Sequence, residues 1–72
     1  MAVVIDLRGV PCPLSWAKAK VRLEMLQPGT NVEILLDDPK GVRDLPRAAE
    51  AHGYHVGDVL PDGVAWRVLL EV

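Results

Sequence analysis

Turn-forming residues interrupt this chain so often that only short helices and strands can form between them. Runs rich in Val, Ile and Leu predict strands, whereas runs rich in Ala, Leu, Lys and Glu predict helices. The predicted order is strand 3–7, helix 13–26, strand 31–36, helix 39–52, strand 54–59 and strand 64–72. This order predicts an α+β fold, a two-layer βαβαββ sandwich.

The order of the segments also predicts the arrangement of the sheet. A helix that joins two neighbouring strands makes a right-handed crossover and leaves the two strands parallel. The Pro-Asp-Gly sequence at 61–63 is a strong turn signal and predicts a hairpin between the last two strands. We therefore expect a mixed four-stranded sheet with both helices packed on one face.

The second helix contains two prolines, and they leave its start open. Asp38 is a good N-cap residue, and Pro39 suits the first helical position. The ring of Pro46 clashes with the carbonyl four residues earlier, so the helix either kinks at Pro46 or begins near it. We favour one irregular helix that ends at Gly53, and its start stays open.

A chain of 72 residues makes one domain, here 1–72, near the lower limit for folding without covalent or metal staples. A single cysteine excludes an internal disulfide, and no Cys/His spacing matches a structural zinc site. Half of the residues are apolar, so a hydrophobic core can supply the stability. The net charge of −2 gives no electrostatic footprint for direct nucleic-acid binding.

Other features point to a cytoplasmic protein. No stretch resembles a signal peptide, and none approaches the roughly 18 apolar residues of a membrane helix. A thiol without a partner suits a reducing compartment. Neither His52 nor His55 has ligand spacing to Cys12, so we expect no metal and no cofactor. We expect a monomer when the protein is free, with no membrane contact.

Cys12 lies between two prolines where a predicted strand gives way to a helix. The residue before a proline favours extended geometry, so Cys12 is predicted to be the N-cap, with Pro13 first in the helix. The amides of Leu14 and Ser15 would then favour an anion at the sulfur and lower the thiol pKa. The alternative is that this lone cysteine is a small hydrophobic residue in the core.

The first helix has two apolar stripes at helical spacing. One consists of Trp16, Ala19, Leu23 and Leu26, and the other consists of Leu14, Ala17, Val21 and Met25. Only one helix face can rest on the sheet, so the second stripe either contacts the neighbouring helix or stays exposed beside Cys12 and binds partners. The cations between the stripes are Lys18, Lys20 and Arg22. They either surround such a patch with positive charge, with Lys18 and Arg22 as partner-binding candidates, or form an ordinary solvated face. Trp16 is expected to pack in the core, or to shield the sulfur.

Four segments together resemble the TusA/SirA family of small sulfur carrier proteins. They are Asp-Leu-Arg-Gly-Val-Pro-Cys-Pro at 6–13, Gln-Pro-Gly at 27–29, Asp-Asp-Pro at 37–39 and Arg-Asp-Leu-Pro at 43–46. The resemblance implies the βαβαββ fold and a cysteine that carries sulfane sulfur as a persulfide. By position, Cys12 would hold the sulfur and Pro13 would set the helix start.

The resemblance also places Arg8, Asp37, Asp38 and Arg43 in recurrent motifs of the family. Asp38 is either a helix cap or a recognition residue, and Arg8 either binds a partner or pairs with a nearby carboxylate. The family pattern is Cys-Pro-x-Pro, whereas this chain has Ser15 in place of the second proline. We expect the Ser15 amide and hydroxyl to face the sulfur and to stabilise its thiolate.

The resemblance implies a cysteine desulfurase or a rhodanese-like protein as sulfur donor and a downstream protein as acceptor. The pathway would be tRNA thiolation, cofactor assembly or sulfur oxidation, with no independent turnover by the carrier. One rival is a regulatory module that binds through the first helix and does not need Cys12. The other is a thiol redox enzyme, which the absence of a second cysteine disfavours.

Overall fold

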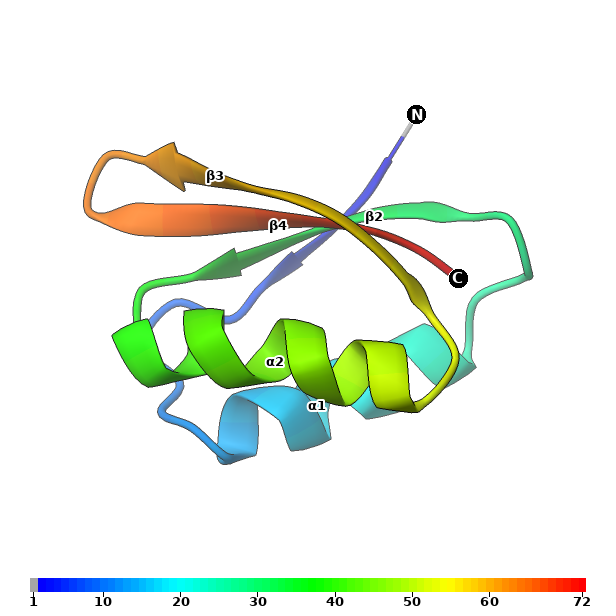
Figure 1. Ribbon diagram of the computed structural model, residues 1–72, viewed down its shortest axis with the longest axis horizontal. Coiled ribbons are helices and arrows are strands. Elements are labelled where there is room, and N and C mark those ends of the chain that lie inside the picture. Colours follow the sequence, from blue (N-terminus) through cyan, green and yellow to red (C-terminus); the bar gives the residue numbers. More distant parts are fainter. Residues whose placement is uncertain (1) are drawn as a thin grey trace.

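The computed structural model describes residues 2–72 as two helices lying on one face of a four-stranded sheet (Figure 1). The strands are β1 (Val3–Asp6), β2 (Asn31–Leu36), β3 (His55–Asp62) and β4 (Ala65–Glu71). The helices are α1 (Leu14–Glu24) and α2 (Pro39–Ala51), which contact each other along the sheet. The predicted α+β sandwich with both helices on one face is confirmed.

The sheet has the order β1-β2-β4-β3. Strands β1 and β2 are parallel, as the crossover argument predicts, and β3 and β4 are antiparallel, as the hairpin argument predicts. Strands β2 and β4 are also antiparallel. Because β1 and β2 run in the same direction, the loops that follow them leave from the same edge of the sheet. This edge brings residues 7–13 next to residues 37 and 38.

The hairpin differs from the prediction. Strand β3 continues through Pro61 to Asp62, and the turn consists of Gly63 and Val64. Gly63 has a φ of 65°, which a residue with a side chain rarely adopts and which suits a two-residue hairpin. A proline fits within β3 because this strand forms an edge of the sheet, where a missing amide costs little.

Helix α2 begins where the cap and proline signals indicate. The Asp38 carboxylate accepts a hydrogen bond from the Lys40 amide, and Pro39 occupies the first turn. Pro46 lies inside α2 without ending it, and the helix is continuous to Ala51. The favoured interpretation, a single helix that runs through Pro46, is confirmed; its start, which the two prolines left open, is Pro39, and it ends at Ala51.

The core forms where helical rows of period four meet alternate residues of the central strands. Strands β2 and β4 contribute Val32, Ile34, Leu36, Val68 and Leu70. The helices contribute the rows Ser15, Ala19, Leu23 and Gly41, Leu45, Ala49. Small side chains in both rows let α1 and α2 lie close to the sheet and to each other.

Ser15 and Gly41 set the spacing between the two helices. A Cβ atom on Gly41 would lie 3.3 Å from the Ser15 hydroxyl oxygen, tighter than an ordinary contact. That hydroxyl is fully buried and is, among residues 2–72, the buried side-chain polar atom without a hydrogen-bond partner. A buried unpaired hydroxyl destabilises the folded state, commonly by about 1–3 kcal/mol.

We predict that replacing this pair reveals a coupled contact. Ser15→Ala should leave the free energy of unfolding unchanged or raise it, because it removes an unpaired hydroxyl. Gly41→Ala should add about 0.5–1 kcal/mol in the Ser15→Ala background, through lower backbone entropy in the unfolded chain. In the wild-type background Gly41→Ala should raise the free energy of unfolding by less, because the new methyl group comes close to the Ser15 hydroxyl oxygen. Urea unfolding of the four proteins measures this, and equal effects of Gly41→Ala in both backgrounds would contradict it.

Candidate functional site

Cys12 lies in the loop between β1 and α1, at the sheet edge where β1 and β2 end. Its side chain is partly exposed, so it is not part of the hydrophobic core. The alternative of Cys12 as a core residue is therefore wrong. Cys12 can therefore be reached in part from outside the protein, as chemistry with a partner would require.

Two carboxylates from the loop after β2 hold the Cys12 loop in place. The Cys12 amide donates a hydrogen bond of 2.8 Å to Asp38 Oδ2, and the Lys40 amide donates one of 3.0 Å to Asp38 Oδ1. The Gly9 amide donates to Asp37 Oδ1 at 2.9 Å. Both amide contacts lower the pKa of Asp38, with Cys12 the larger cause. Asp38 is thus a helix cap that also fixes the cysteine loop.

Cys12 is not the N-cap of α1, which corrects the prediction. The N-cap is Pro13, with φ −92° and ψ 2°, and the helix begins at Leu14. Cys12 precedes this cap, its amide donates to Asp38, and the peptide bond between Cys12 and Pro13 is cis. The Ser15 amide donates to the Pro11 carbonyl at 3.1 Å instead of facing the sulfur.

The expected role of Ser15 is therefore wrong. Its amide is occupied by the Pro11 carbonyl, and its hydroxyl is buried beside Gly41 of α2. Ser15 belongs to the contact between the helices. It does not stabilise a thiolate at Cys12.

The predicted decrease of the Cys12 pKa is also wrong, because the surroundings of the sulfur raise it. Partial burial is the largest cause, followed by the charge of Asp44 and a contact of 3.8 Å between the sulfur and Asp44 Oδ2. The Asp38 charge acts in the same direction, whereas the Arg43 charge opposes it. A thiol beside two carboxylates keeps its proton more firmly than a thiol in water.

The predicted cations Arg8 and Arg43 are both engaged in ion pairs. The Arg43 Nε atom lies 3.0 Å from Asp44 Oδ1, and this pair lowers the pKa of Asp44. Arg8 binds Asp6 through two side-chain contacts of 2.9 and 2.7 Å, which with the Arg8 amide lower the pKa of Asp6 to about 2. For Arg8, the predicted pairing with a nearby carboxylate is the arrangement found.

Asp44 is the site residue that the sequence analysis missed. It belongs to the Arg-Asp-Leu-Pro segment at 43–46, but its contact with Cys12 joins residues 32 positions apart. Helical spacing places Asp44 beside the buried row of Gly41, Leu45 and Ala49, and this spacing does not indicate which loop Asp44 meets. The one sequence signal that could have indicated Asp44 is its position next to Arg43, in one of the four segments that resemble the family.

The second apolar stripe of α1 is exposed instead of packed on α2. Leu14 is 49% exposed, Val21 61% and Met25 79%. The interpretation that this stripe contacts the neighbouring helix is therefore wrong. Trp16, from the other stripe, packs against the core, and its ring centroid lies 5.3 Å from that of His52.

A groove of about 500 Å³ runs beside the exposed stripe. Its lining combines apolar and charged side chains from β1, the following loop and α1: Asp6, Leu7, Val10, Ala17, Lys18, Val21 and Arg22. The predicted partner-binding cations Lys18 and Arg22 thus border an apolar surface. A surface of this kind is typical of a protein–protein contact.

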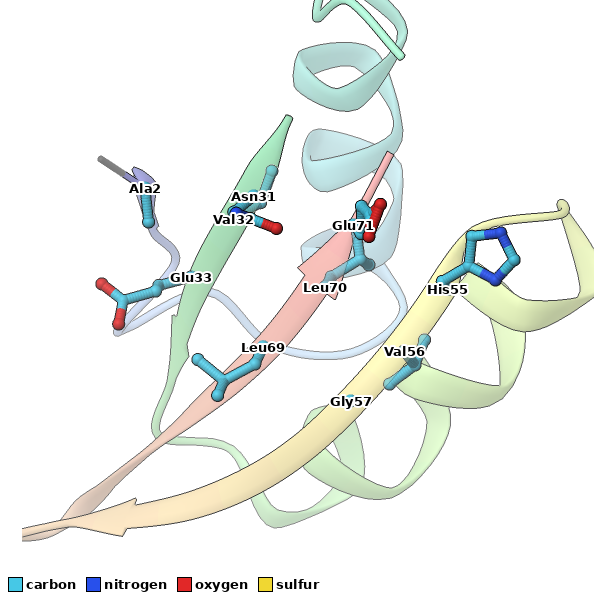
Figure 2. Close-up of a pocket in the computed structure, with 10 residues that line it drawn as sticks. All are labelled: Ala2, Asn31, Val32, Glu33, His55, Val56, Gly57, Leu69, Leu70 and Glu71. Carbon is cyan, nitrogen blue, oxygen red and sulfur yellow. The ribbon is translucent and has the colours of Figure 1, made fainter. Parts of the chain in front are cut away.

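A second hollow, of about 360 Å³, lies on the sheet and does not include Cys12 (Figure 2). Its lining includes Glu33, Leu69 and Glu71, which alternate with buried residues and so face away from the helices, and His55 from β3. Within residues 2–72, no three His, Cys, Asp or Glu side chains gather as a metal site. Neither helix of this part of the chain is long and apolar enough to cross a membrane.

Comparison with known proteins gives consistent matches over nearly the whole chain. The family described as "Sulfurtransferase TusA" matches residues 3–72. A "Putative sulfur carrier protein" of Archaeoglobus fulgidus is 33% identical over 69 residues, covering 94% of this chain and 78% of that protein. "Putative sulfur carrier protein YedF" of Escherichia coli K12 is 31% identical, covering 93% of this chain and 87% of YedF.

The fold comparison agrees with the sequence comparison. The crystal structure of a SirA-like protein from Desulfitobacterium hafniense superposes with a TM-score of 0.80. The match covers 97% of this chain and 96% of that one, at 28% sequence identity. Both comparisons therefore concern the entire sandwich, including the Cys12 loop and α2.

We predict that the two oxygens of Asp38 have separable roles. Asp38→Ala removes the helix cap and the hold on the Cys12 amide, and should lower the melting temperature by about 4–8 °C. Asp38→Asn keeps one acceptor oxygen, so it should lose less stability while still releasing one of the two amides. Hydrogen exchange at Cys12 and Lys40 identifies the released amide. Equal exchange in wild type and both variants would contradict the arrangement.

The same variants give a pH dependence of known sign. The pKa of Asp38 is lowered in the folded protein, so its charge stabilises the fold at pH values above the ordinary aspartate pKa of about 3.9. That contribution is lost as the pH falls through the lower folded pKa. The difference in stability between wild type and Asp38→Asn should therefore shrink in acid, and a constant difference would argue against it.

Proposed function

The chain belongs to the TusA family, and we propose that it is a sulfur carrier that accepts sulfane sulfur on Cys12 as a persulfide and passes it to an acceptor protein. The observation that carries the proposal is the partly exposed Cys12, whose backbone amide is held by the Asp38 hydrogen bond. The relatives described as sulfur carrier proteins support the same role.

Loading is a thiol exchange reaction. The Cys12 thiolate attacks the outer sulfur of a donor persulfide, so that a new S–S bond forms at Cys12 and the S–S bond of the donor breaks. The donor cysteine leaves with the electron pair as a thiolate and takes up the proton that Cys12 gave up. Delivery is the same exchange, with the acceptor thiolate attacking the outer sulfur on Cys12. Neither step needs an external oxidant or reductant.

The partners are a cysteine desulfurase or a rhodanese-like protein as donor and a downstream protein as acceptor. Lys18 and Arg22 border the apolar groove of α1 and are suited to bind such partners. Arg8, Asp38 and Arg43 act mainly within the chain, through their contacts around the cysteine loop. The carrier has no turnover of its own, since loading requires a donor protein and delivery requires an acceptor protein. Its free thiol suits the cytoplasm.

A second function has a specific observation in its favour. The exposed residues Leu14, Val21 and Met25 form a surface that could bind a partner without any chemistry at Cys12. In that case the protein is an interaction module, and the cysteine is dispensable. A thiol redox enzyme has no comparable support, since the chain holds one cysteine and no resolving thiol.

We predict that incubation with a cysteine desulfurase and cysteine adds about 32 Da, the mass of one sulfur atom of a persulfide, to the wild-type protein. Intact-mass spectrometry measures the adduct, and Cys12→Ser should show none. An adduct that persists in Cys12→Ser, or no adduct with either donor class, would contradict the carrier. Retained binding to the desulfurase by Cys12→Ser with no adduct on wild type would favour the module.

We also predict that a charge on the exposed stripe impairs transfer between proteins. Val21→Glu places a carboxylate in the apolar groove and should raise the KM of the donor enzyme for this carrier by roughly tenfold or more. The matched control is Val64→Glu, since Val64 is 93% exposed and lies in the hairpin turn. Alkylation of Cys12 by a small reagent should be equal in all three proteins. Equal KM values in wild type and Val21→Glu would exclude the groove as the docking surface.

A further inference from the structure

The carboxylate of Asp44 contacts the sulfur but has no part in the exchange chemistry described above. Asp44 Oδ2 lies 3.8 Å from the Cys12 sulfur, across the contact between the β1–α1 loop and α2. The guanidinium of Arg43 holds the same carboxylate, with Nε 3.0 Å from Oδ1 and a terminal nitrogen 3.4 Å from Oδ2. The three groups form a chain of contacts from thiol to carboxylate to guanidinium.

This arrangement favours the protonated sulfur. The S–H group donates toward an oxygen that is already negative, and loss of the proton would place two negative charges side by side. The Asp38 carboxylate, on the loop before α2, acts on the sulfur in the same direction. Arg43 is the opposing cation, but its donors are directed at Asp44. The charge of Arg47, also in α2, helps to lower the pKa of Asp44.

The ion pair can be reached from outside. The Asp44 side chain is 43% exposed and the Arg43 side chain 63%, while Cys12 beside them is partly buried. A cation brought by another protein could therefore compete with Arg43 and the thiol for the Asp44 oxygens. Such a cation would neutralise the carboxylate, and it would free Arg43 to face the sulfur.

We propose that Asp44 is a positioning residue that keeps Cys12 as a thiol in the free protein, and that donor and acceptor proteins release it with a cationic side chain that pairs with Asp44. The inference rests on the proposed carrier function, and it adds a chemical requirement on the partners. It also bears on delivery, because a thiol that holds its proton firmly is a poor leaving group. A loaded sulfur then stays on Cys12 until a partner cation arrives.

The first test measures alkylation of the unloaded protein by iodoacetamide, which reacts with the thiolate. Asp44→Asn keeps the shape and removes the charge, and it should react about fivefold faster at pH 7, the size expected for adjacent unit charges screened by water. The matched control Asp58→Asn, an exposed carboxylate of β3, should react like wild type. Wild-type rates in Asp44→Asn would overturn the proposal.

The variant Arg43→Gln distinguishes an effect of charge on the alkylation rate of Cys12 from an effect of a loosened cysteine loop. It removes the cation that opposes Asp44, so Cys12 should react more slowly than in wild type. Loosening of the loop would instead accelerate alkylation in Asp44→Asn and Arg43→Gln alike. Opposite changes in the two variants support the proposal, and faster reaction in both overturns it.

The requirement for a cation is tested with two reagents of opposite charge. Wild type should react faster with trimethylammonioethyl methanethiosulfonate, a cation, than with sulfonatoethyl methanethiosulfonate, an anion. The ratio of the two rates should fall in Asp44→Asn and stay at the wild-type value in Asp58→Asn. An equal ratio in wild type and Asp44→Asn would overturn the requirement.

Discharge of the loaded protein to glutathione distinguishes this inference from the carrier function itself. If neither donor class forms an adduct on Cys12, the carrier function fails, and the alkylation results still decide the role of Asp44. If the adduct forms, Asp44→Asn should lose it to glutathione faster than wild type. Equal discharge rates would overturn the role of Asp44 and leave the carrier function standing.

Discussion

The site depends on one carboxylate that serves two backbone segments. Asp38 caps α2 through the Lys40 amide and binds the Cys12 amide with its other oxygen. The bond is possible because β1 and β2 are parallel, so that their following loops emerge at the same edge. Together with the bond from the Gly9 amide to Asp37, this bridge fixes the cysteine loop against the start of α2, where the sulfur contacts Asp44.

The surroundings of the sulfur favour storage more than reactivity. A helix N-terminus would have stabilised a thiolate, but Cys12 lies outside α1, and its neighbours on the α2 side include Asp38 and Asp44. A carrier that meets many thiols benefits from a cysteine that reacts only when a partner changes its surroundings. The exposed α1 stripe, with Lys18 and Arg22 beside it, supplies a surface on which such a partner could bind.

The sequence was sufficient for features that depend on local patterns. Alternation in β2, the Asp38-Pro39 start of α2 and the parallel first pair follow from periodicity, capping and crossover geometry. Predictions of features that depend on contacts between distant segments were either absent or wrong. The contact of Asp44 with Cys12 spans 32 positions, and the N-cap of α1 is Pro13 instead of Cys12, whose amide is bonded to the distant Asp38. The turn shifted to Gly63 because β3 is an edge strand that accepts Pro61.

The central claim is that Cys12 rests as a thiol and is activated by a partner. Titration of the Cys12 thiolate by ultraviolet absorbance, taken as the difference from Cys12→Ser, tests it most directly. The account predicts a pKa above the ordinary thiol value in the free protein. It also predicts a decrease of that pKa when a desulfurase whose reactive cysteine is replaced by serine is bound. A thiolate already formed at neutral pH in the free protein, or a pKa that binding leaves unchanged, would contradict the account.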